Sequence, residues 1–193
     1  MRNVVALSMA VLITAAVSSL VPVPGETAHA GCGVWRWNVK TMADPGAAQV
    51  NLTPRQGLIG TLRGLPAPGH LSSSLGRTAA ERVTYTVRAK LTFVKQEADS
   101  DFHVVLADPQ SGATMIAEIP VPACAQGSRV QAQISRVRSA FIQRFGQPST
   151  TRFERIPGSP VANVTGVFFF DEIHGQKGVA PNGVELHPVI GLQ

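Results

Sequence analysis

Charge and aromatic side chains are both scarce in this chain of 193 residues, at 15% and 6% of the sequence. The positive residues form no block, because they are scattered from Arg36 to Lys177. Few aromatic residues are candidates for exposure, which argues against a stacking platform for single-stranded nucleic acid. After the first thirty residues, no apolar run is long enough to span a bilayer. What remains is the composition of one globular domain with a net charge of +5, an excess that favours an anionic partner.

The chain has only two cysteines, Cys32 and Cys124. Two soft ligands are too few for a typical cysteine metal site, and a catalytic thiol is unusual outside the cytosol. An isolated pair in an exported protein is most simply a disulfide. We expect Cys32 and Cys124 to be joined, which closes a loop of about 90 residues and stabilises the fold by about 4–5 kcal/mol in the chain-entropy model.

The first thirty residues have the pattern of a signal peptide. Arg2 precedes an apolar stretch that prolines end, and residues 28–30, Ala-His-Ala, are the small-x-small sequence that signal peptidase requires. We expect cleavage after Ala30, a mature chain that begins at Gly31, and a secreted or periplasmic bacterial protein. An uncleaved anchor and lipid attachment at Cys32 are the alternatives. The prolines argue against the first, and His29 argues against the second.

Hydrophobic periodicity predicts the elements of the second half. Residues 83–93 alternate between apolar and polar side chains, as in a long half-buried strand. Further strands are expected at 102–107 and 114–119, and then at 161–170 and 184–190 after a helix. The helix has Ser128 as its N-cap and Gly146 as its stop. Its apolar stripe consists of Val130, Ile134, Val137, Phe141 and Phe145.

Three strands, a helix and two strands form the element order of the OB-fold, a five-stranded Greek-key barrel. We therefore predict a mainly β fold with one helix: an OB-like barrel over residues 81–193, preceded by an irregular N-terminal arm over 31–80 and the signal peptide over 1–30. A short strand is expected at 34–41 in the arm. The fifth strand is expected to close the barrel against the first. An α+β sandwich is the alternative fold.

Three segments carry a resemblance: residues 99–106 (DSDFHVVL), 114–120 (TMIAEIP) and 169–188 (FFDEIHGQKGVAPNGVELHP). They resemble a family of uncharacterised exported bacterial proteins, over residues 82–190. The resemblance agrees with an OB-like architecture and with export. It implies no particular activity.

The residue types suited to chemistry gather in two places. In an OB-fold, the loop after strand one and the loop after strand four flank the same binding surface. The turn at 97–100 and the loop at 171–183 should therefore converge at the barrel mouth. The candidate binding residues are Asp99, Asp101, His103, His174, Gln176, Lys177, Asn182, Glu185 and His187.

Three interpretations of this cluster stay open. In the first, the side chains only hold the loops in shape. In the second, the loops bind an anionic polymer or a glycan, because long loops on a rigid scaffold concentrate binding residues. In the third, the chain is a small metal-assisted hydrolase, nuclease-like or glycan-directed, with His103, His174 and His187 as metal candidates. No H-E-x-x-H or G-x-S-x-G motif is present, so we expect a non-enzymatic binding module with no cofactor.

Overall fold

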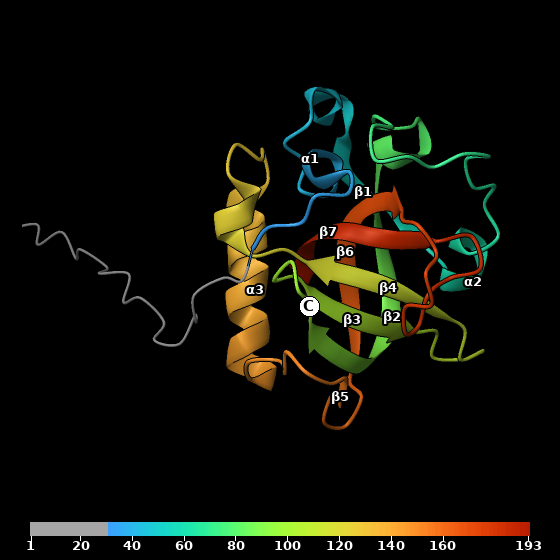
Figure 1. The fold of residues 1–193 in the computed structure, drawn as a ribbon. Helices are drawn as coiled ribbons and strands as arrows, with labels where there is room; N and C mark the ends of the chain where they lie inside the picture. Colours follow the sequence, from blue (N-terminus) through green and yellow to red (C-terminus); the bar gives the residue numbers. More distant parts are fainter. Residues whose placement is uncertain (1–30) are drawn as a thin grey trace, which may run out of the picture.

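A computed structural model describes residues 31–193 of the chain (Figure 1). The predicted signal peptide, with its cleavage site after Ala30, lies outside the described residues. Within 31–193 no helix has the length and apolar character to cross a membrane. The described chain forms a closed five-stranded β-barrel with one long helix, which confirms the predicted fold class.

The barrel strands are neighbours in the order β2-β3-β4-β7-β6, and β6 pairs back with β2 to close the ring. All of these pairs are antiparallel except β4 with β7, which is parallel. Closure therefore involves the first and fourth barrel strands, so the expectation that the fifth strand pairs with the first is wrong. The barrel strands are β2 (Val83–Gln96), β3 (Phe102–Ala107), β4 (Thr114–Ile119), β6 (Val161–Phe170) and β7 (Val184–Leu192).

β2 is long enough to serve both halves of the barrel. Its residues 84–90 pair with β6, and its residues 90–96 pair with β3. The register shifts between Leu91 and Phe93, where the strand passes from one neighbour to the other. A two-residue strand that periodicity did not predict, β5 (Glu154–Arg155), pairs with the end of β2.

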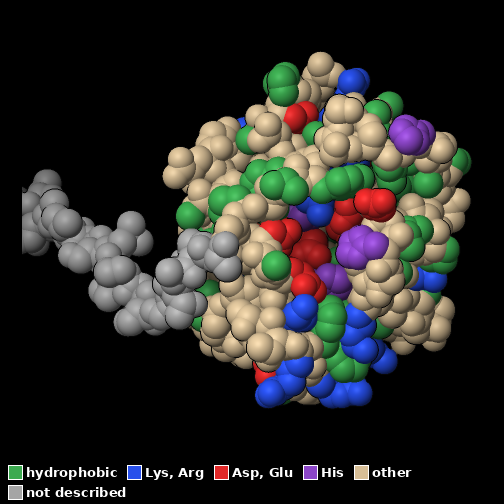
Figure 2. All heavy atoms as spheres, viewed as in Figure 1, with side chains coloured by type: hydrophobic (Ala, Val, Ile, Leu, Met, Phe, Trp, Pro, Cys, Tyr) green, Lys and Arg blue, Asp and Glu red, His purple; other side chains and the backbone are tan. Residues whose placement is uncertain are grey.

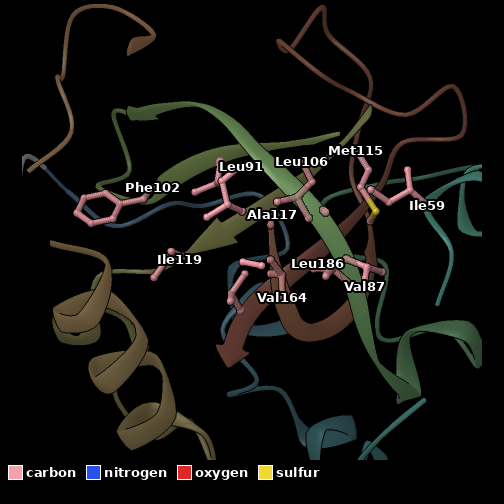
Figure 3. Packing of buried hydrophobic residues seen from close by; sticks show 14 of the residues in the cluster. Ile59, Val87, Leu91, Phe102, Leu106, Met115, Ala117, Ile119, Val164 and Leu186 are labelled. Atoms are coloured by element: carbon pink, nitrogen blue, oxygen red, sulfur yellow. The ribbon is translucent and has the colours of Figure 1, made fainter. Parts of the chain in front are cut away.

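Alternating side chains fill the barrel interior. Leu91, Phe102, Leu106, Ala117 and Leu186 belong to one buried cluster, and Figure 3 shows them converging from different strands. Because side chains alternate along a strand, the residues between them point outward. The outward side chains of β3, β4 and β7 therefore build whatever surface the barrel wall presents.

Helix α3 (Gln131–Phe145) packs at one side of the barrel (Figure 1). Ile134 and Phe141 are buried, and Gly146 ends the helix with a φ of 83°. The predicted N-cap was wrong by two residues. Val130 takes that position, and the Ser128 hydroxyl accepts a hydrogen bond from its N–H instead.

The N-terminal arm has more regular structure than its composition indicated. Its strand β1 (Asn51–Gly57) adds to the sheet in parallel with β2. The strand expected at 34–41 is wrong, because Arg36 has a φ of 47° and a helical turn follows it. The short helical elements of the arm are α1 (Trp37–Lys40), η1 (Pro45–Gln49) and α2 (Ile59–Leu62). Two more follow, η2 (Ala80–Arg82) where the arm meets the barrel and η3 (Pro122–Ala125) after β4.

The predicted disulfide is present. Cys32 and Cys124 are bonded, with their Cα atoms 5.5 Å apart. The bond fixes the start of the arm to η3, between β4 and α3. The arm is therefore tied to the barrel next to the surface described below.

Candidate functional site

A pocket of about 540 Å³ opens on the outer wall of the barrel. The β2–β3 turn and the β6–β7 loop both border it, so the predicted convergence of these two loops is observed. The arm contributes a third side through Trp35, Trp37 and Lys40. Figure 2 shows acidic side chains gathered in a hollow at the centre of this face, with basic side chains below them.

Strand alternation explains why the floor of the pocket is polar. Ala117 and Leu186 point into the barrel core, so Glu118 and Glu185 beside them point outward. His103 lies between the core residues Phe102 and Val104 and is outward for the same reason. The site therefore lies on the outer face of β3, β4 and β7, and the expected position at the barrel mouth is wrong.

His103 and Glu118 form a buried pair on the pocket floor. Nδ1 of His103 lies 3.0 Å from Oε1 of Glu118, and Nε2 donates to the backbone oxygen of Lys177 at 2.9 Å. Both ring nitrogens thus face acceptors, which favours the doubly protonated imidazolium. Burial alone lowers the pKa of His103, but the Glu118 carboxylate outweighs it and raises the pKa to about 9. Burial raises the pKa of Glu118, and His103 opposes that rise.

A second buried group lies below the floor and centres on His187. Its Nε2 is 3.2 Å from Oδ2 of Asp101, and its Nδ1 is 3.8 Å from Oε2 of Glu185. All three residues are 1% exposed. Burial lowers the pKa of His187, but Asp101 and Glu185 raise it to about 9. Burial raises the pKa of both Asp101 and Glu185.

The arm places one lysine against this acidic group. Nζ of Lys40 donates to Oδ2 of Asp171 at 3.0 Å, and both side chains are nearly buried. Burial lowers the pKa of Lys40, but Asp171 and Glu185 raise it overall, so the lysine stays charged. Trp35 packs edge-on against Phe169, the outward member of the three consecutive phenylalanines on β6. This contact holds the arm over the barrel wall.

Two carboxylate oxygens in the pocket are left without hydrogen bonds. Oε2 of Glu118 and Oε2 of Glu185 are buried and accept no hydrogen bond from any residue in 31–193. Glu118 is 8% exposed and Glu185 is 1% exposed, and both side chains line the pocket. A buried acceptor without a donor is costly, and such groups commonly mark functional sites.

Six of the nine candidate residues line the pocket. They are Asp99, His103, His174, Gln176, Lys177 and Glu185. Asp101 and His187 lie below the floor and shape it from beneath. Asn182 does not belong to the site, because its amide donates to the backbone oxygens of Leu62 and Leu65 and so holds α2 in place.

Several lining residues were not among the candidates. The sequence does mark Glu118, which is the single charged residue of the short strand β4. The sequence does not mark the arm residues Trp35, Trp37 and Lys40, because their place at the pocket depends on how the arm packs against the barrel. The other acidic and aromatic additions are Glu97, Phe153, Asp171 and Glu172.

The three histidines proposed as metal candidates occupy different positions. His103 is hydrogen-bonded at the pocket floor, His187 is buried beneath that floor, and His174 is exposed on the β6–β7 loop. Across residues 31–193, no three or more His, Cys, Asp or Glu side chains are grouped so that they could hold a metal ion. Comparisons of the chain with protein-family models, with curated proteins and with solved structures find no match. A function therefore has to be inferred from the residues that line the pocket.

Proposed function

We propose that this chain is an exported, non-enzymatic binding module whose pocket holds a segment of a glycan. The observation that carries the proposal is the position of the pocket. In OB-fold barrels, the face of strands two and three and the loops after strands one and four bind oligonucleotides and oligosaccharides. Those elements correspond here to β3, β4, the β2–β3 turn and the β6–β7 loop, and all of them line the pocket.

The charge of the lining favours a sugar over a nucleic acid. The acidic side chains outnumber the cationic ones, which are Lys40, Lys177 and the imidazolium of His103. The acidic side chains are Glu97, Asp99, Glu118, Asp171, Glu172 and Glu185. Such a surface repels phosphate groups, although the whole chain is basic. Of the two expected partners, an anionic polymer or a glycan, the pocket supports a glycan that is not itself anionic.

The mixture of side chains also suits a sugar. Half-buried Trp35, Trp37 and Phe153 line the pocket together with the carboxylates and the amide of Gln176. Ligand pockets typically combine apolar and aromatic walls with a few placed polar groups that fix orientation. A pyranose ring presents both an apolar face and hydroxyl donors, and this lining offers a surface for each.

Export is part of the proposal. The disulfide between Cys32 and Cys124 is the kind of bond that persists in oxidising compartments. The signal-peptide pattern of residues 1–30 supports the same location, and so does the resemblance to exported bacterial proteins. We assign the mature chain to the bacterial periplasm or exterior, where glycans are abundant.

His174 provides a test that separates binding from stability. Its side chain is exposed on the β6–β7 loop at the pocket edge. We expect His174→Ala to weaken binding in a glycan array read with the mature protein, and to change the free energy of unfolding by less than about 0.5 kcal/mol. The matched control is His70→Ala, which removes an exposed histidine away from the pocket and should leave binding unchanged. A wild-type protein that binds no glycan on the array would contradict the proposal.

A hydrolase directed at the same glycan is the second candidate. It is favoured by one observation: Glu118 and Glu185 both line the pocket, and burial raises the pKa of each. Glycosidases use such a pair of carboxyl groups, one of them protonated. We expect no cleavage products when a bound oligosaccharide is incubated with the protein and analysed by mass spectrometry. Products that disappear with Glu118→Gln would establish the hydrolase instead.

A further inference from the structure

The two unpartnered carboxylate oxygens identify the kind of group that the pocket accepts. Oε2 of Glu118 and Oε2 of Glu185 each lack a donor among residues 31–193. They come from β4 and β7, which are adjacent parallel strands. Both residues line the pocket, so its floor holds two buried acceptors from neighbouring strands.

None of the nearby cations of the described chain donates a hydrogen bond to these two oxygens. His103 contacts the other oxygen of Glu118 and bonds to the backbone of Lys177. Lys40 bonds to Asp171, and His187 lies closer to Asp101 than to Glu185. Both Oε2 atoms therefore remain as acceptors for a ligand.

We propose that the pocket takes a glycan carrying a primary ammonium group, such as a deacetylated hexosamine, with its ammonium seated between Glu118 and Glu185. This inference rests on the proposed glycan-binding function and names the substrate class. An ammonium has three donors and a positive charge, so one group satisfies both oxygens and offsets the excess of acidic side chains. A hydroxyl has only one donor and leaves the charge uncompensated.

The overall charge of the protein makes the inference easy to test. A net charge of +5 repels a polyamine in general. A preference for an amino sugar over its N-acetylated form therefore cannot come from non-specific attraction to the whole surface. It has to come from a local acidic site.

The experiment is calorimetric titration of the mature protein with glucosamine hexamer and with N-acetylglucosamine hexamer, at a pH where the amines are charged. We expect the amino form to bind roughly tenfold tighter or more, the effect of one or two hydrogen bonds to a charged group. Glu118→Gln and Glu185→Gln should each reduce this preference. Glu154→Gln removes an acidic side chain outside the pocket lining and should keep it.

The outcomes distinguish this inference from the function on which it rests. Equal affinity of the wild-type protein for the two hexamers, or tighter binding of the acetylated one, would overturn the inference and leave glycan binding in place. Binding of neither hexamer, together with a blank glycan array, would overturn both. The comparison of hexamers uses the wild-type protein alone, so it holds even if a glutamate variant does not fold.

Discussion

Two buried groups of charged side chains lie where the N-terminal arm meets the barrel, and they differ in how completely their polar atoms are hydrogen-bonded. In the first, Arg36 and Glu81 form a two-pronged pair with both oxygen contacts at 2.8 Å and both side chains fully buried. The guanidinium also donates to the backbone oxygens of Leu75, Gly76 and Phe170. The Glu81 carboxylate accepts further bonds from the backbone N–H groups of Thr78 and Phe170.

The second group is the pocket floor together with His187 beneath it, and its hydrogen bonding is incomplete. Glu118 and Glu185 each keep an oxygen without a donor, and neither Nδ1 nor Nε2 of His187 makes a well-formed hydrogen bond within the described chain. Unsatisfied buried polar groups reduce stability. We assign the two groups different roles: the fully hydrogen-bonded pair holds the arm to the barrel, and the incompletely bonded group is the one to which the proposed function assigns a ligand.

The largest expected effect on stability comes from the fully hydrogen-bonded pair of Arg36 and Glu81. Glu81→Gln leaves the Arg36 charge buried without its counter-charge, so we expect the free energy of unfolding to fall by about 3–5 kcal/mol. Urea denaturation followed by circular dichroism measures this loss. A loss below about 1 kcal/mol would show that the pair does not hold the arm, and the comparison would fail.

The two groups should also respond to pH in opposite directions. Burial raises the pKa of Glu81, but its bonds to Arg36 and to backbone N–H groups lower the pKa overall from its ordinary value of 4.5. A carboxyl group with a lowered pKa stabilises the fold above its unfolded pKa, and this contribution is lost as the pH falls through the folded value. Glu81 therefore contributes to the acid limb of the stability profile.

The alkaline limb of the profile belongs to His103 on the pocket floor and His187 beneath it. The pKa of both His103 and His187 is raised to about 9. Their contribution is complete below pH 6.5 and is lost as the pH rises through about 9. We expect His103→Gln to flatten the alkaline limb and Glu81→Gln to flatten the acid limb, in thermal melts recorded from pH 3 to 10. The account is contradicted if both variants flatten the same limb.

The smallest effect is expected at an exposed ion pair. Arg152 and Glu154 are 3.1 Å apart, and the arginine side chain is 75% exposed. Glu154→Gln should change the free energy of unfolding by no more than about 1 kcal/mol, because water screens the pair. The same urea titration checks this value. A change as large as that of Glu81→Gln would mean that burial does not set the scale of these effects.

The barrel was predictable because its strands are amphipathic. The limits of β3, β4 and β6 follow from alternation and from flanking turn residues, and the loop convergence follows from the topology that those strands define. The arm was not predictable, because helical turns of four residues carry too little periodicity to be read. Its course depends on Arg36, whose partner Glu81 is 45 residues away.

In the candidate site, too, the barrel residues were easier to predict than the arm residues. Six loop and strand residues of the pocket could be named from the sequence, because a topology places whole loops together. Glu118 was missed although its strand was predicted correctly and contains no other charged residue, because its place beside the strand of Glu185 depends on the pairing of β4 with β7. Trp35 and Lys40 were missed because only tertiary packing brings the arm over the barrel wall.

One variant measured in two ways tests the central claim most directly. Glu185→Gln keeps the shape of the side chain and removes a buried charge that has no hydrogen bond at Oε2. We expect the free energy of unfolding to change by at most about 1 kcal/mol, because the charge is poorly compensated in the free protein. We also expect the affinity for glucosamine hexamer to fall roughly tenfold. A loss of several kcal/mol in stability with unchanged affinity would show that the pocket floor is structural and would contradict the account.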